Sequence, residues 1–389
     1  MLQVESSWTS RIQFDLVCRH WKENLPFSDA KHVKITEHTS NATSVLMSHL
    51  SHGYRYLITV SVINSNMAIT SDILELLGYC ERLRSLELRV KKCDVSWFPA
   101  FERLEFLHIE LTQIIEGAVG RESKFSDTIN AMPKLQSLVL TIRNGLPLTL
   151  ANAALKRLKI CSPTLNANEF SHLVNKCDGL EELSISSHEL TNLKDAPISS
   201  SRNNIQRLAL DDCRLLTDDD LSVIVTRISE SLRELSVYGC PGISSYVALG
   251  FLPNLETFHI DDLAAATNSP SEQGFVGLES LFELIATNID WEQFFVSIPD
   301  NCMLKDFSYM GAGLNDIMLG VLASKCPLLE SIYIFNWGPL GITSGGVMFI
   351  LSVLKCLKRL LIPYSSLGDE IFVVLLDEVS CITKLVNHH

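Results

Sequence analysis

The stretch from Asn204 to Ile243 most constrains what this chain can fold into, because it contains the same phrase twice. The pattern I-x-x-L-x-L-x-x-C at 205–213 returns 27 residues later as L-x-x-L-x-V-x-x-C at 232–240. Between the two copies, four apolar residues fall at helical spacing: Leu221, Ile224, Val225 and Ile228. Each unit therefore predicts a short strand, a turn and an amphipathic helix. One unit cannot bury its own apolar face, so it needs copies stacked on either side.

Those copies exist along most of the chain. Their first anchor residues lie 20 to 31 residues apart, and all gaps but one fall within the leucine-rich-repeat window. We therefore expect an α/β leucine-rich-repeat solenoid, or horseshoe, with a parallel concave sheet, convex helices and about 12–13 repeats. Its cysteines make it similar to the ribonuclease-inhibitor-like type of repeat. The first anchors are Leu57, Leu83, Leu104, Leu135, Leu155, Leu180, Ile205, Leu232, Leu255, Leu278, Leu304, Leu329 and Leu357.

The N-terminal segment does not follow the repeat. The run L-V-C-R-H-W-K-E-N-L at 16–25 predicts a helix whose apolar face carries Leu16, Val17, Trp21 and Leu25. This run resembles the second half of an F-box, where a V-C-[KR]-x-W core precedes leucine-rich repeats. The opening L-P-x-E segment of that family has no counterpart before Ile12, so we expect a partial module. We divide the chain into a partial F-box-like helical segment or N-terminal cap at 1–29 and a repeat domain at 30–389.

The resemblance to F-box/leucine-rich-repeat proteins implies a function. It implies a substrate-recognition subunit of a ubiquitin ligase, which docks on a Skp-type adaptor and cullin and holds a target protein on the concave face. Leu16, Val17, Trp21 and Leu25 then become the candidate adaptor-binding residues. Two alternatives stay open: the N-terminal helix is a plain cap on the first repeat, or the repeats form a scaffold or adaptor with no ubiquitin-ligase connection.

Composition excludes several other classes of function. The net charge of −13 and the lack of a basic stripe argue against nucleic-acid binding. No run approaches the ~18 apolar residues of a membrane span, and the polar N-terminus lacks a signal peptide, so we expect a cytoplasmic or nuclear protein without membrane contact. Eleven cysteines, an odd number at repeat-equivalent positions, fit that compartment better than a disulfide framework.

No catalytic, metal or cofactor motif stands out. The chain lacks a C-x-x-C pair, a P-loop and the common nucleophile motifs, so we expect no metal, no cofactor and no enzymatic activity. Cys213 and Cys240 sit at turn positions, where a thiol can donate to backbone carbonyl oxygens. Helix N-terminal caps are expected at Thr217 to Asp220, at Asn315 with Asp316, and at Thr70 with Ser71 and Asp72. The glycine-rich turn at 341–346 is expected to enter a helix at 347–354. A third class, an enzyme or GTPase activator on this scaffold, needs an exposed arginine with Asn or Asp partners, and none is singled out.

The candidate binding surface consists of residues that flank the buried strand positions. His108 and His259 are expected to point outward there. Aromatic and sulfur side chains gather in the last repeats, as is typical of binding hot spots; the alternative is that the truncated C-terminal end buries them. An acidic segment from Asp211 to Asp262 could steer a cationic partner or be a solvated face. The candidate partner-binding residues are Tyr238, Asp261, Met310, Tyr333, Phe335, Trp337 and Tyr364.

Overall fold

The computed structural model describes most of the chain after Lys31. Contacts between residues divide the chain into two compact units, Met1–Leu180 and Glu181–His389. The predicted helix at 16–25 lies outside the described residues. The residues that the structure describes are 31–39, 41–53, 57–95, 98–114, 122–142, 148–196, 204–244, 252–261, 298, 300, 302–311, 314–336, 341–362 and 384–385.

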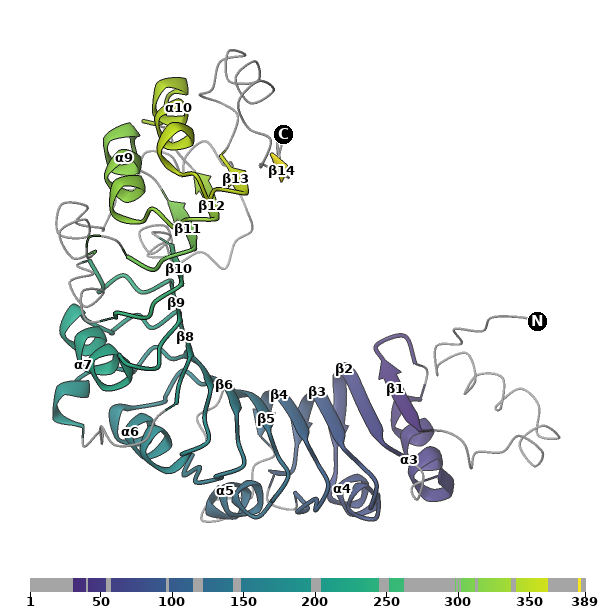
Figure 1. Ribbon diagram of the computed structural model, residues 1–389. Helices are drawn as coiled ribbons and strands as arrows, with labels where there is room; N and C mark the ends of the chain where they lie inside the picture. The colour runs from purple at the N-terminus through teal and green to yellow at the C-terminus, as the bar shows by residue number, and fades with distance from the viewer. Residues whose placement is uncertain are drawn as a thin grey trace, which may run out of the picture. The chain divides into compact units, whose positions relative to one another are not determined.

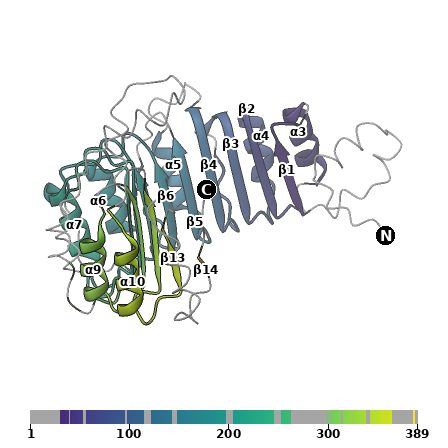
Figure 2. The same cartoon turned by 90° about the horizontal axis from the view of Figure 1, so that it is seen from above.

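The first unit is a parallel sheet whose strands follow chain order, with the helices on one side (Figure 1). Figure 2 shows its first strands lying side by side. The strands are β1 (His32–Thr36), β2 (Thr59–Ile69), β3 (Ser85–Cys93), β4 (Phe106–Ile114), β5 (Ser137–Ile142) and β6 (Arg157–Cys161). The helices are α3 (Ala42–Gly53), α4 (Ser71–Gly78), α5 (Glu122–Asn130) and α6 (Ala167–Lys176).

The second unit repeats this arrangement. Its parallel strands are β7 (Glu182–Ser186), β8 (Arg207–Asp211), β9 (Glu234–Tyr238), β10 (Thr257–Asp261), β11 (Asp306–Gly311), β12 (Ser331–Asn336), β13 (Arg359–Leu361) and β14 (Lys384–Leu385). Its helices are the 3₁₀ turn η4 (Leu193–Asp195), α7 (Asp218–Ile228), α9 (Asp316–Lys325) and α10 (Ser344–Val353). The strand and helix pattern confirms the predicted α/β leucine-rich-repeat solenoid.

The core is made by the leucine positions of the phrase. On β8, Leu208 and Leu210 are 1% and 0% exposed, while Arg207 at the start of the same strand is exposed. This alternation is the period-two pattern of a strand with one buried face. The register aligns Leu208 with Leu183 on β7 and with Leu235 on β9, so the apolar side chains stack from one repeat to the next.

Side-chain caps begin four of the helices that the structure describes, α6, α7, α9 and α10, and the sequence predicted those of α7 and α9. Thr217 caps α7 through a capping box with Asp220, and Asn315 accepts a hydrogen bond from the Met318 N–H at the start of α9. Thr343 caps α10, which therefore begins three residues before the predicted start at Val347. Thr70 is the N-cap of α4 and Asp72 lies in its first turn, as predicted, but the Thr70 hydroxyl makes no cap hydrogen bond.

Two expectations about the repeats need correction. Not every repeat carries an α-helix: β3 leads into β4, and β5 into β6, without one in the described residues between them. These are the short repeats, which leave little chain for a helix and its two connections. In addition, β10 pairs directly with β11 through Phe258 and Phe307. The sheet therefore has no position between them for the expected strand at 278–284, a segment outside the described residues.

Within the part of the chain that the structure describes, no helix is long and apolar enough to cross a membrane.

Candidate functional site

The sheet face that carries no helix is the candidate site in both units (Figure 1). Strand alternation sends one set of side chains to this open face and the other to the core. On β8, Arg207 is exposed and both Ala209 and Asp211 are half-buried, whereas the leucines between them are buried. Side chains on the open face are therefore free of the core and available for contact with a partner.

In the second unit, the strand register collects the outward residues into rows. Most members of the central row are small, so the larger side chains of His259, Tyr333 and Leu361 project further from the sheet than their neighbours. The row runs Ser184, Ala209, Ser236, His259, Ser308, Tyr333 and Leu361.

An arginine links three strands at one end of this face. The Nη2 atom of Arg359 on β13 lies 3.3 Å from Oδ1 of Asp306 on β11, so the side chain crosses β12. On the way, its guanidinium carbon lies 5.8 Å from the ring centroid of Tyr333, within cation–π distance. We call Asp306, Tyr333 and Arg359 the Arg359 cluster.

Ser331 lies under the Arg359 cluster. The register places it between Asp306 and Arg359, on the same face of β12 as Tyr333, and it is 0% exposed. Its hydroxyl oxygen has no hydrogen-bond partner in the described structure. A buried hydroxyl without a hydrogen-bond partner lowers the stability of the folded state.

His259 on β10 lies beside the Arg359 cluster. Burial lowers the pKa of this imidazole, although the nearby carboxylates of Glu234 and Asp306 act in the opposite direction. Its Nδ1 atom is buried and has no hydrogen-bond partner among the described residues. The lowered pKa favours the neutral imidazole, and its unpartnered Nδ1 atom faces away from solvent.

The predicted partner-binding residues fall into three groups. Tyr238 on β9 and Tyr333 on β12 are half-buried on the open face. The backbone register makes Asp261, Met310 and Phe335 direct neighbours on consecutive strands. Outside the described residues lie Trp337 and Tyr364 and all four predicted adaptor-binding residues, Leu16, Val17, Trp21 and Leu25.

Sequence reasoning missed Asp306 and Arg359. Both occupy the third position of the phrase, in L-K-D-F at 304–307 and L-K-R-L at 357–360. Opposite charges at the same position two strands apart were the available signal. The reach across β12 became visible only once the register was known.

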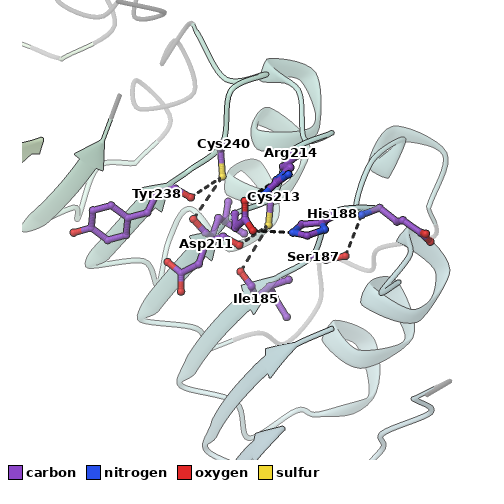
Figure 3. A network of polar contacts seen from close by, with 11 residues as sticks. Ile185, Ser187, His188, Asp211, Cys213, Arg214, Tyr238 and Cys240 are labelled. Carbon is purple, nitrogen blue, oxygen red and sulfur yellow. Dashed lines mark hydrogen bonds and ion pairs between the residues drawn. The ribbon is translucent and has the colours of Figure 1, made fainter. Parts of the chain in front are cut away.

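Cys213 lies in the turn after β8, and Cys240 lies in the equivalent turn after β9 (Figure 3). The Cys213 thiol lies 3.7 Å from the carbonyl oxygen of Ile185, and the Cys240 thiol lies 3.6 Å from that of Leu210. Each thiol thus donates to a carbonyl of the preceding repeat, and the two residues are 0% and 6% exposed. This confirms the predicted turn role. The ring of Tyr238 points away from both sulfur atoms.

Several carboxylates of the acidic segment serve the fold itself. Asp212, in a left-handed backbone conformation, lies 2.9 Å from Nε of Arg214 and 2.7 Å from Nε2 of His188. Asp218 accepts hydrogen bonds of 3.0 Å from both the backbone N–H and the hydroxyl of Ser244 in the next repeat. These two carboxylates therefore make contacts within the fold, which neither interpretation of the acidic segment had predicted, and steering of a cationic partner stays a prediction.

The first unit has a polar cluster of its own on the open face. A carboxylate oxygen of Glu87 accepts a 2.6 Å hydrogen bond from Ser61, and the other lies 2.8 Å from Nε of Arg89 and 3.5 Å from Nδ1 of His108. His108 faces outward as predicted, but its side chain is only 13% exposed because Glu87 and Phe106 pack against it. Burial and Arg89 lower the pKa of His108.

The described residues contain no group of three or more His, Cys, Asp or Glu side chains placed to hold a metal ion.

Comparisons with known proteins add similarity of fold only. No protein-family model and no curated protein sequence matches the chain. Among solved structures, an internalin of Listeria monocytogenes is 13% identical, with a TM-score of 0.47 over 99% of this chain and 95% of that one. A chain from the complex of Rad7 and Elc1 in yeast is 14% identical, with a TM-score of 0.45 over 78% of this chain and 75% of that one. A leucine-rich-repeat protein of Leptospira interrogans is 14% identical, with a TM-score of 0.37 over 94% of this chain and 98% of that one. The assignment of the fold rests on the repeats of this chain itself.

Proposed function

We propose that this chain binds a partner protein on the open face of strands β9 to β13 and acts by recruitment, without catalysing a reaction. The observation that carries the proposal is the Arg359 cluster, in which a tyrosine and an arginine lie together on a sheet face that none of the described helices covers. Tyrosine and arginine are the residue types most enriched at the energetic centres of protein interfaces.

The geometry of the cluster supports this proposal. Arg359 is held by Asp306 and stacked on Tyr333, so its guanidinium group loses little conformational freedom when a partner binds. The Arg359 side chain remains 48% exposed, which leaves donors for a partner's carbonyl or carboxylate oxygens.

A narrower proposal concerns what recruitment achieves. The resemblance of residues 16–25 to the second half of an F-box supports a substrate receptor that presents the bound target to a Skp/cullin-type ubiquitin ligase in the cytoplasm or nucleus. In that case Leu16, Val17, Trp21 and Leu25 contact the adaptor and the repeats hold the target. The rival is a scaffold that binds its partner in the same way without any ligase.

The binding proposal is tested with a partner captured by the wild-type chain. Its affinity is then compared for wild type, for the double variant Tyr333→Ala with Arg359→Ala, and for Lys358→Ala as the control. Lys358 is the neighbouring cation, but it pairs with Glu330 at 2.6 Å outside the row. We expect the double variant to weaken binding at least tenfold, about the loss of one hot-spot contact, with an unchanged far-UV CD spectrum. Equal affinity for all three proteins would remove this surface.

The ligase proposal has a separate test. A purified Skp-type adaptor is titrated against the full chain and against Trp21→Ala with Leu25→Ala, which leaves the repeats unaltered. Binding that the double variant abolishes supports the receptor. No adaptor binding, with the partner of the previous test still bound, leaves the scaffold as the function.

A further inference from the structure

Two cysteines of the second unit lie beside each other without forming a disulfide. Cys302 precedes β11, and its backbone N–H donates a 2.9 Å hydrogen bond to the carbonyl oxygen of Lys325. Cys326 is the next residue and the C-cap of α9. The backbone bond brings the two cysteines of neighbouring repeats side by side, close enough for their free thiols to form a hydrogen bond.

Their surroundings give the two sulfurs different roles. Cys326 is 0% exposed, whereas Cys302 is half-buried and reachable from solvent. The Cys302 sulfur accepts hydrogen bonds from the Cys326 thiol and from the backbone N–H groups of Leu304 and Met303. These donors outweigh burial and lower the pKa of Cys302 to about 7. Burial and the bond to Cys302 raise the pKa of Cys326. Cys302 is the thiolate of the pair, and Cys326 is the thiol.

The other cysteines that the structure describes lack this combination. Cys213 and Cys240 lie close together, but both are buried and both donate to backbone carbonyl oxygens. Cys356 is exposed, and no second described cysteine is placed against it by any hydrogen bond. Only accessibility, thiolate character and an adjacent second sulfur together favour oxidation to a disulfide.

We infer that Cys302 and Cys326 form a peroxide-sensitive thiol pair, in which Cys302 is the oxidised residue and Cys326 the resolving one. The Cys302 thiolate attacks one oxygen of a hydroperoxide and breaks the O–O bond, giving a sulfenic acid and releasing hydroxide or alkoxide. The Cys326 sulfur then attacks the Cys302 sulfur, the S–O bond breaks, and water leaves with the Cys326 proton. In sum, two thiols and one hydroperoxide give one disulfide, one water and the reduced alcohol or a second water.

The disulfide would join the start of β11 to the end of α9, and the loop that it closes contains both elements. The same repeat supplies Asp306 to the Arg359 cluster, so oxidation would restrict opening of the repeat next to the proposed binding surface. The thiol chemistry itself does not depend on the proposed function.

The test uses the folded, reduced full-length chain and hydrogen peroxide at a few equivalents. After alkylation of the remaining thiols, non-reducing peptide mass spectrometry is expected to show one main cross-link, Cys302 to Cys326. The same treatment in urea is expected to lose this selectivity, because the pairing depends on the fold. A native chain in which Cys356 is oxidised first, or in which Cys302 and Cys326 stay alkylatable, would overturn the inference.

Variants assign the two roles. Cys326→Ser is expected to leave a sulfenic acid on Cys302 that a dimedone probe traps, whereas Cys302→Ser should leave Cys326 reduced. Cys356→Ser is the control and should form the cross-link at the wild-type rate. A sulfenic acid on Cys326 in the Cys302→Ser variant would contradict the assigned order. Far-UV CD checks that each variant folds, and the wild-type cross-link decides the pairing on its own.

Discussion

A single buried carboxylate, Asp220, holds two repeats together at the residue scale. It is 2% exposed, and its Oδ1 accepts a 2.6 Å hydrogen bond from the backbone N–H of Leu193 in the preceding repeat. Its Oδ2 accepts bonds from the backbone N–H and the hydroxyl of Thr217, at 3.1 and 2.7 Å. Asp220 is thus part of the capping box of α7, and it also accepts a hydrogen bond from the first residue of η4 in the preceding repeat.

Replacing this carboxylate is expected to destabilise the second unit. Asp220→Ala leaves the buried N–H of Leu193 and the part-buried N–H of Thr217 without their acceptor, and we expect the free energy of unfolding to fall by about 2–3 kcal/mol. Asp219→Ala is the matched control, since Asp219 is exposed on the same helical turn and should change stability by about 0.5 kcal/mol or less. Urea unfolding followed by far-UV CD measures both. Equal effects from the two variants would show that the hydrogen bonds of Asp220 contribute nothing specific.

At the scale of elements, the residue just before each strand from β9 to β13 alternates between a cation and a carboxylate. Glu256, before β10, lies 2.6 Å from Nη1 of Arg233, before β9, and 2.7 Å from Nζ of Lys305, before β11. Glu330 and Lys358 repeat the pattern before β12 and β13 at 2.6 Å. These side chains are partly exposed, so each pair contributes little to stability.

The Glu256 pairs predict a pH dependence. Lys305 and Arg233 hold the pKa of Glu256 below its ordinary value of 4.5 in the folded protein, although burial opposes them. Because the folded pKa is the lower one, this stabilisation is complete above about pH 4.5 and is lost as the pH falls through the folded pKa. We expect Glu256→Gln to lower the free energy of unfolding by about 1 kcal/mol at pH 7 and the difference to close in acid.

Urea unfolding at a series of pH values checks this expectation. Glu102→Gln serves as the control, because Glu102 is exposed and makes no ion pair within the described residues. A difference between wild type and Glu256→Gln that persists below the folded pKa would assign the effect to packing rather than to charge.

Over the whole molecule, each repeat contacts only its neighbours in the chain-ordered sheet of its unit, so the effect of a core mutation should stay local. Leu235 on β9 is 0% exposed and aligns with Leu208 on β8 and Phe258 on β10. We expect Leu235→Ala to destabilise its surroundings by about 2–5 kcal/mol. Amide hydrogen exchange should then rise in β8 to β10 and α7 and stay unchanged in β1 to β3. A uniform rise along the chain would mean that the repeats unfold together.

The sequence by itself determined the repeat, the strand positions and the buried face. Leu208 and Leu210 are buried because a period-two pattern with one apolar face has one way to satisfy both faces. The caps at Thr217 and Asn315 and the turn thiols of Cys213 and Cys240 are local features, so the chain around them was sufficient to predict them.

Only the tertiary structure decided which distant side chains meet. The contact of Arg359 with Asp306 depends on the register of three strands, and the contact of Cys302 with Cys326 depends on how one repeat stacks on the next. The missing helix between β3 and β4 reflects the same dependence, because repeat length sets what fits between two fixed strands. Such relations join residues 24 to 53 positions apart. They are consequences of stacking, to which no local pattern responds.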